Sequence, residues 1–149
     1  MIPLTLTRQE TLPVGTTQVF SPQTAREVRA MLEMAVQAGG TAPRAQIPGY
    51  RVAGKTGTAY KLENGQYAKK YVASFVGFAP ASDPRLIVAI MIDEPSGLQH
   101  YGGDVAGPIF ANVMGSALRT LGIPPDSATS PDAPHMQVAH SAQLSKDEL

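Results

Sequence analysis

The sequence predicts an α+β domain, with an antiparallel sheet of about three main strands and flanking helices. Three strand-like segments, residues 50–62, 71–79 and 85–93, follow one another with only short turns between them. Parallel neighbours need long crossover connections, so the short turns indicate an antiparallel meander. One helical pattern precedes these strands and another follows them. The helices are therefore expected to flank the sheet rather than alternate with its strands.

The first helix is predicted to begin after Ser21 and to end at Gly39-Gly40. Serine is a favoured N-cap, and Pro22 suits the first helical position. A glycine ends a helix readily because it adopts left-handed backbone angles without strain. The apolar residues recur at helical spacing and predict one buried stripe: Ala25, Val28, Met31, Leu32, Ala35 and Val36. Before this helix, residues 2–7 alternate like a strand.

The three strands are separated by recognisable turn residues. Asn64-Gly65 separates the first two strands and is a strong signal for a tight hairpin. The second and third are joined by "PASDP", residues 80–84, which is rich in turn-forming residues. The longest apolar run, "LIVAIMI" at 86–92, has the length of a strand and is too short to span a membrane.

A second helix is predicted to begin near Pro108, because proline suits N1 and disfavours helix at Gly107. Its apolar face comprises Ile109, Phe110, Val113, Met114, Ala117, Leu118 and Leu121. Beyond Ile123 the chain lacks periodicity and is rich in Pro, Ser and Ala. We therefore expect a domain over residues 1–123 and a disordered tail over 124–149.

Composition excludes several classes of function. Lysine plus arginine and aspartate plus glutamate are both 12, so no net charge favours nucleic acid or an anionic membrane. Cysteine is absent, which excludes disulfides, thiolate zinc sites and a cysteine nucleophile. The three histidines are too scattered for a ligand cluster, so neither a metal nor a cofactor is expected. The chain opens without a signal-peptide pattern, and no membrane segment is predicted.

Residues 49–56, "GYRVAGKT", satisfy the pattern of a phosphate-binding loop. The apolar run ending at Asp93 also resembles the strand whose acidic end helps to place magnesium in nucleotide hydrolases. Such a loop needs an apolar strand before it and a helix N-terminus after it. Here Pro48 precedes the pattern, and Gly57, Thr58 and a hairpin signal follow it. A strand is therefore favoured, and a nucleotide hydrolase is the less favoured alternative.

If "KTGT" is a strand, its residues can bind a peptide that ends in a carboxylate. Alternation places Lys55 and Gly57 on one face and Thr56 and Thr58 on the other. Near an edge, an ammonium and a hydroxyl group can still converge on one carboxylate. Gly57 lets a ligand backbone lie flush against the strand. The free edge also offers amides for strand addition or for binding an oxyanion.

Three longer signatures carry a family resemblance: "IPGYRVAGKTGTA", "SFVGFAPASDPRLIVAIMIDEPSG" and "YGGDVAGPIFANVMGSAL". Together they resemble the C-terminal part of the transpeptidase domain of class B penicillin-binding proteins, most of all the septal transpeptidase of Gram-negative cell division. The resemblance covers roughly residues 1–125. It implies an incomplete penicillin-binding/serine β-lactamase-like fold. The reaction implied is acyl transfer, in which a serine attacks a D-Ala-D-Ala stem and the peptidoglycan becomes cross-linked.

The resemblance also implies a role for each residue of the motif. Lys55 and the hydroxyls of Thr56 and Thr58 would bind the carboxylate of a stem peptide or a β-lactam. The Thr58 backbone N–H would complete the oxyanion hole, and Gly57 would keep the edge open. The parent proteins have an inner-membrane anchor and a periplasmic catalytic domain, and division proteins are candidate partners.

The nucleophile motifs of this family, Ser-x-x-Lys and Ser-x-Asn, do not occur in the sequence. In the family both lie N-terminal to the matched region, so we expect a fragment that is inactive alone. A non-catalytic penicillin-binding-like interaction module is the remaining alternative. The other polar features are not expected to take part in chemistry. We expect Asp93-Glu94 to be solvated charges, His100 to be an exposed loop residue, and Tyr101-Gly102-Gly103 to shape a loop.

Overall fold

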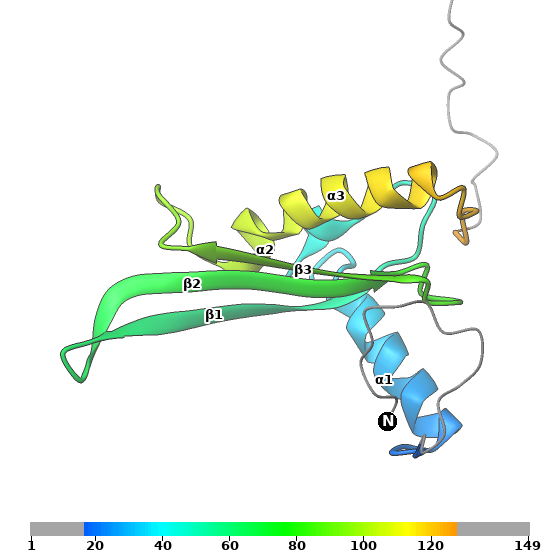
Figure 1. Ribbon diagram of the computed structural model, residues 1–149, viewed down its shortest axis with the longest axis horizontal. Coiled ribbons are helices and arrows are strands. Elements are labelled where there is room, and N and C mark those ends of the chain that lie inside the picture. Colours follow the sequence, from blue (N-terminus) through cyan, green and yellow to red (C-terminus); the bar gives the residue numbers. More distant parts are fainter. Residues whose placement is uncertain (1–16, 128–149) are drawn as a thin grey trace, which may run out of the picture.

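The computed structural model describes residues 17–127, which form a three-stranded antiparallel sheet of order β1-β2-β3. Helix α3 lies along one face of the sheet, and α1 lies against the other near one end (Figure 1). The elements are α1 (Pro22–Met34), the 3-10 turn η1 (Pro43–Ala45), β1 (Ala53–Glu63), β2 (Gln66–Ala79), β3 (Leu86–Asp93), α2 (Gly102–Val105) and α3 (Gly107–Thr120). The predicted fold class is confirmed. The strand predicted at residues 2–7 lies outside the described residues.

The β1–β2 hairpin is a long arm that extends past the third strand. Its turn residues Asn64 and Gly65 have φ angles of 50° and 78°, the left-handed values that a two-residue hairpin turn requires. The predicted Asn-Gly turn is thus confirmed. Asp93, at the end of β3, pairs with Val72, so the part of the hairpin from Val72 to its turn continues without a third strand. A register irregularity between Tyr60 and Leu62 marks this projecting part.

The core lies between the sheet and α3. Phe75 of β2 and Phe110 of α3 are fully buried and meet edge-to-face, with ring centroids 4.7 Å apart. Met114 and Leu118 follow Phe110 at helical spacing and are also fully buried. The predicted apolar face is therefore confirmed for Phe110, Met114 and Leu118. It is wrong for Ile109, Val113 and Leu121, which are 41%, 46% and 61% exposed. The helix begins at Gly107, one residue before the predicted start.

Helix α1 differs from its prediction in length and in burial. It ends at Met34, because the next N–H groups bond three residues back and the chain then turns, with the Ala42 N–H bonding to Ala35 O. The predicted buried stripe is wrong, since the helix buries no residue and Met31 is 65% exposed. Only Val36, beyond the end of the helix, joins the core. The reason is that the described residues supply no second layer over this helix.

The sheet face opposite α3 is apolar and largely uncovered in the described part of the chain. Strand β3 alternates, with Val88, Ile90 and Ile92 packing on the core. Ile87 and Met91 point the other way and are 75% and 73% exposed. The sheet therefore has one covered face and one exposed face, and α1 covers only part of the latter (Figure 1).

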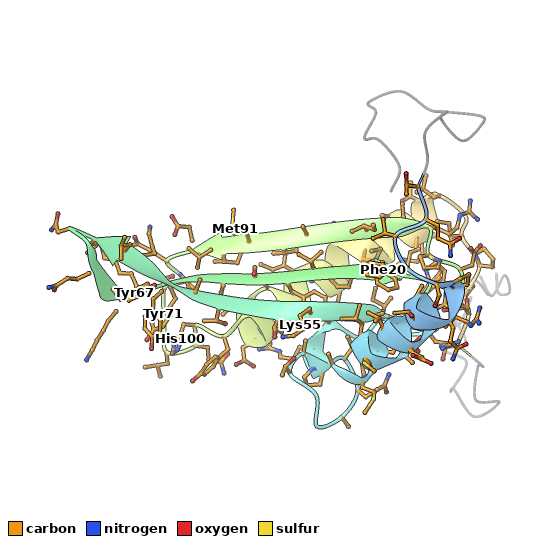
Figure 2. All side chains as sticks on the ribbon, turned by 90° about the horizontal axis from the view of Figure 1, so that it is seen from below. Phe20, Lys55, Tyr67, Tyr71, Met91 and His100 are labelled. Carbon is orange, nitrogen blue, oxygen red and sulfur yellow. The ribbon has the colours of Figure 1, made fainter. Side chains whose placement is uncertain are left out.

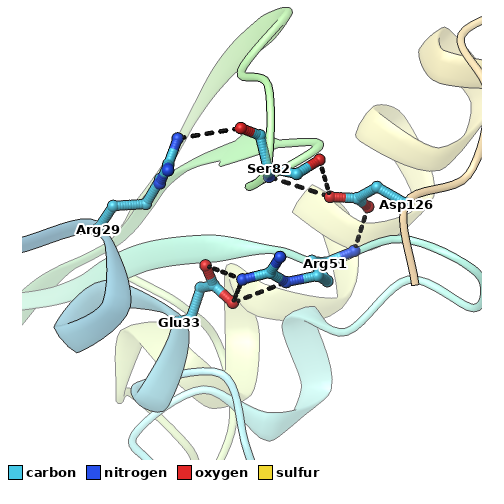
Figure 3. Close-up of polar contacts among 5 residues, drawn as sticks. All are labelled: Arg29, Glu33, Arg51, Ser82 and Asp126. Carbon is cyan, nitrogen blue, oxygen red and sulfur yellow. Dashed lines mark hydrogen bonds and ion pairs between the residues drawn. The ribbon is translucent and has the colours of Figure 1, made fainter. Parts of the chain in front are cut away.

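A polar network fixes the entry to β1 (Figure 3). Asp126 accepts hydrogen bonds from the Arg51 N–H at 2.7 Å and from the Ser82 N–H and hydroxyl at 3.0 and 2.7 Å. Arg51 pairs with Glu33 of α1 at 2.9 Å, and Arg29 bonds to Ser82 O. Residues 124–127 thus lie against the domain. The remainder of the predicted tail, residues 128–149, falls outside the described range.

Candidate functional site

The "KTGT" motif, residues 55–58, lies in the first half of β1, which is an edge strand of the sheet. Lys55 pairs with Val76 of β2, and Thr58 pairs with Ala73. The other edge of β1 faces no strand among residues 17–127. Because Lys55 and Thr56 lie inside a strand, they do not open a helix whose amides could hold a phosphate. The structure therefore argues against the phosphate-loop alternative.

Thr56 and Thr58 line one cavity of about 320 Å³ on the α2 side of β1. The Thr56 hydroxyl donates to the Thr41 hydroxyl at 3.3 Å, and the Gly102 N–H donates to the Thr58 hydroxyl oxygen at 3.1 Å. The Thr58 oxygen is thus held by the protein, while its hydrogen remains able to donate to a ligand. The cavity is lined by Thr41, Thr56, Thr58, Tyr101, Gly102 and Asp104.

Lys55 lies on the opposite face of β1 from the two threonines, as strand alternation predicts. Its side chain is exposed, and its ammonium group donates to Thr56 O at 3.2 Å. No carboxylate of the described residues forms an ion pair with it. A ligand that uses both Lys55 and the threonine hydroxyls must therefore lie along the free edge of β1, where both faces are within reach.

The structure gives a reason for glycine at position 57 that could not be inferred from the sequence. A Cβ at this position would lie 2.5 Å from the Ser74 hydroxyl oxygen on the paired strand. The missing side chain thus makes room for Ser74 beside the site strand.

Tyr101 and Gly102, at the start of α2, form one wall of the cavity, although only a loop-shaping role was expected of them. A Cβ on Gly102 would overlap the carbonyl oxygens of Ser74 and Gly57, and one on Gly103 would overlap Thr41 O. Paired glycines before a helix are a signal of close backbone approach, and this signal was available in the sequence. The role of Thr41 in the site could not be predicted from the sequence, because only the tertiary fold brings it to Thr56.

An aromatic cluster continues from the cavity along the projecting hairpin (Figure 2). The Tyr71 ring stacks on the His100 ring, with their centroids 4.0 Å apart, and its centroid lies 4.9 Å from that of Tyr60. The centroids of Tyr60 and Tyr67 are 6.3 Å apart in an edge-to-face contact. Tyr101 contacts His100 at 4.5 Å. Hydrogen bonding to Tyr60, with some burial, raises the pKa of the Tyr71 phenol. His100 is half-buried in this stack, so the prediction of a simply exposed loop histidine is wrong.

Ion pairs hold the base of the same hairpin. Lys61 lies 2.6 Å from Glu94 and 3.0 Å from Asp93, and Lys70 lies 2.6 Å from Glu63. Hydrogen bonds to Glu94 and then to Asp93 raise the pKa of Lys61. The two acidic residues at the end of β3 are exposed, as predicted, and in addition both pair with Lys61. Within residues 17–127 there is no cluster of metal-ligating side chains. None of the helices in this range is long and apolar enough to cross a membrane.

Comparison with known proteins identifies the family. Residues 2–115 match the model of the penicillin binding protein transpeptidase domain. The chain belongs to this family. It is 48% identical over 126 residues to the probable peptidoglycan D,D-transpeptidase PenA of Neisseria gonorrhoeae, covering 84% of this chain and 22% of that protein. It is 42% identical over 131 residues to the peptidoglycan D,D-transpeptidase FtsI of Escherichia coli K12, covering 87% of this chain and 22% of the relative.

A solved structure agrees with the fold. The apo transpeptidase domain of Burkholderia pseudomallei penicillin-binding protein 3 matches with a TM-score of 0.71 and 52% identity. The match covers 81% of this chain and 37% of that one. The family predicted from the sequence signatures is thus confirmed. The chain spans about a fifth of the length of the curated relatives it matches (22% for both proteins named above).

Proposed function

We propose that this chain supplies the carboxylate-binding and oxyanion-binding half of a peptidoglycan D,D-transpeptidase site. The observation that carries the proposal is the placement of Thr56 and Thr58 on one cavity, beside the free edge of β1. Membership of the transpeptidase family and the names of the relatives support the substrate class. The Lys-Thr-Gly-Thr roles themselves are our proposal.

In this proposal, a stem peptide ending in D-Ala-D-Ala lies along the free edge of β1. Its terminal carboxylate accepts hydrogen bonds from the Thr58 hydroxyl and from the Thr56 hydroxyl, which turns away from Thr41 to donate, and it is attracted by the Lys55 ammonium. The scissile carbonyl oxygen accepts a hydrogen bond from the Thr58 backbone N–H, which stabilises the negative charge that develops during attack. A serine hydroxyl then forms an ester with the penultimate residue, and the terminal D-alanine leaves with the proton. A neighbouring stem's amine displaces the serine, which completes the cross-link.

The serine must come from residues other than those of this sequence. None of its serines has lysine three positions on or asparagine two positions on. A well-placed oxyanion hole without a nucleophile gives only residual catalysis. We therefore propose that residues 1–149 bind such ligands without becoming acylated. A septal role and a periplasmic location belong to the same proposal, which the similarity to FtsI supports.

Two measurements test this function. Incubation with a fluorescent penicillin, followed by a denaturing gel, is expected to leave the chain unlabelled, and a labelled band would contradict the missing nucleophile. Titration with an N-acylated D-Ala-D-Ala peptide is expected to shift the amide resonances of Thr56, Gly57 and Thr58. The variant Thr56→Val keeps the side-chain shape and removes the hydroxyl, so it is expected to weaken binding about fivefold to tenfold.

A second candidate function is a non-catalytic interaction module. The observation in its favour is the exposed apolar sheet face that includes Ile87 and Met91. A pulldown with this chain tests the second function. A division protein that is retained by the Thr56→Val variant but not by Ile87→Lys, with no peptide binding at β1, would favour the second function over the first.

A further inference from the structure

We propose that the aromatic platform, formed by Tyr60, Tyr67, Tyr71, His100 and Tyr101, binds saccharide rings of the glycan strand that carries the stem peptide. This inference rests on the proposed function, since it extends the peptide site on β1 towards the sugar to which the peptide is attached. Nothing in the proposed chemistry of Lys55, Thr56 and Thr58 uses these five rings.

The platform is a continuous aromatic surface rather than scattered exposed residues. Each ring contacts the next, in the order Tyr67, Tyr60, Tyr71, His100, Tyr101. Tyr60, Tyr67 and Tyr101 are 57%, 79% and 61% exposed, so these three rings present much of their surface to a ligand. Four of the five tyrosines in the chain belong to the platform.

The chemistry of the rings suits a sugar better than a lipid. Every member has an apolar face and a polar edge, which is either a phenol hydroxyl or an imidazole nitrogen. A pyranose ring likewise has a C–H face and a rim of hydroxyl and amide groups. Lys61 and Lys70 of the same hairpin are paired with carboxylates. Lys69, between Tyr67 and Tyr71 in β2, is exposed and forms no ion pair among the described residues, so its ammonium group can donate to the hydroxyl or amide oxygens of a bound sugar. An N-acetylated sugar matches this combination.

The direction of the bound peptide leads from the site to the platform. In the proposed function the stem's carboxyl end lies at Thr56 and its scissile carbonyl at Thr58. The rest of the stem must therefore run towards Tyr60, which lies on the same face as Thr58. The stem is joined to its sugar by its amino end, so the sugar lies at the far end of this path.

The distance agrees with this direction. About four residues separate the scissile carbonyl from the sugar, and an extended chain covers roughly 13 Å at about 3.3 Å per residue. Strand β1 advances a similar distance, about 13 Å, from Thr58 to Leu62. Leu62 is the residue paired with Tyr67. An extended stem beside β1 thus delivers its sugar to the platform.

Tyr101 joins the two sites, because it lines the threonine cavity and also contacts His100 of the platform. Figure 2 shows Tyr67, Tyr71 and His100 grouped at the projecting end of the sheet, beyond Lys55 along the same hairpin. One ligand of peptide and sugar can therefore occupy both sites without leaving the protein surface.

The test is an NMR titration of the full chain with a tetramer of β-1,4-linked N-acetylglucosamine, which contains the sugar and no peptide. The ring resonances of Tyr60, Tyr67 and Tyr71 are expected to shift, while the amides of Thr56 and Thr58 do not. Tyr67→Ala is expected to weaken binding about fivefold, and Tyr67→Phe to retain it because the ring face remains. Leu98→Ala, a substitution at an exposed residue outside the platform, is the matched control and is expected to change nothing.

The proposal is overturned if the tetramer shifts none of the ring resonances, or if Tyr67→Ala and His100→Ala both leave its affinity unchanged. It is also overturned if a peptide without sugar shifts the rings and the tetramer does not. A separate titration with N-acyl D-Ala-D-Ala distinguishes the two claims. If the peptide binds at Thr56 and Thr58 and the sugar does not bind, the platform proposal is wrong and the proposed function stands. If the sugar binds and the peptide does not, the proposed function is wrong.

Discussion

Replacing Gly102 by alanine tests whether the start of α2, with the loop that leads into it, holds the site strand in place. The added methyl group would overlap the carbonyl oxygen of Ser74 and would lie 2.6 Å from that of Gly57. Both obstacles are backbone atoms of the sheet, so neither can turn aside as a flexible side chain can. The loop must therefore move away from β1, and the hydrogen bond from the Gly102 N–H to the Thr58 hydroxyl must break.

The expected cost follows from these two effects. Overpacking against backbone costs about 1–3 kcal/mol, and the lost hydrogen bond costs about 1 kcal/mol. We therefore expect Gly102→Ala to lower the free energy of unfolding by about 2–4 kcal/mol, a large share of the roughly 5–15 kcal/mol typical of a domain. Urea denaturation followed by circular dichroism measures this change, and the Thr58 amide resonance reports the local displacement.

Gly107→Ala is the matched control for this substitution. A Cβ at Gly107 meets only Ala45 and Arg44 atoms at 3.5–3.7 Å, which is ordinary contact. This variant is expected to be neutral or slightly stabilising, since alanine favours helix more than glycine does. If Gly102→Ala destabilises the protein no more than Gly107→Ala and leaves the Thr58 amide in place, the loop does not brace the site strand and our reasoning about the cavity is refuted.

Three further predictions concern the rest of the chain. Burial works against ionisation of Asp126, but hydrogen bonds from the Arg51 N–H and from Ser82 outweigh it and lower the pKa of this carboxyl group below the usual 3.8. The ionised carboxylate therefore stabilises the fold above pH 3.8, and this stabilisation is lost as the pH falls through the pKa of the folded state. Asp126→Asn is therefore expected to reduce the loss of stability between pH 5 and pH 2 in urea titrations, and an unchanged pH dependence would contradict this assignment. Gly65→Ala is expected to cost about 1 kcal/mol in the same assay, because φ is 78° there; no cost would mean that the turn relaxes. Ile87→Thr is expected to change stability by less than about 0.5 kcal/mol, because the side chain is 75% exposed, and a large loss would show that this face is covered in solution.

Local patterns in the sequence were sufficient to predict the sheet and the motif strand. The Asn64-Gly65 turn has one favoured geometry, and the short connections allow only an antiparallel meander. Strand alternation then placed Thr56 and Thr58 on one face, where the structure has them. These features depend on neighbouring residues, so no knowledge of the tertiary fold was needed.

Features that depend on distant residues could not be predicted. The helical stripe through Met31 was expected to be buried, because periodicity shows which face is apolar and not whether another layer covers it. The contact of Thr41 with Thr56 joins a loop to a strand through the fold alone. The stacking of His100 on Tyr71 likewise unites residues from separate elements.

We propose that the edge of β1 binds the carboxyl end of a D-Ala-D-Ala stem. The most direct test is the titration of the chain with an N-acylated D-Ala-D-Ala peptide, observed at the backbone amides of β1. We expect shifts at Thr56, Gly57 and Thr58 that are weakened in Thr56→Val and that a control peptide, N-acylated L-Ala-L-Ala, does not produce. Equal shifts with both peptides, or shifts that leave these three amides unaffected, would contradict it.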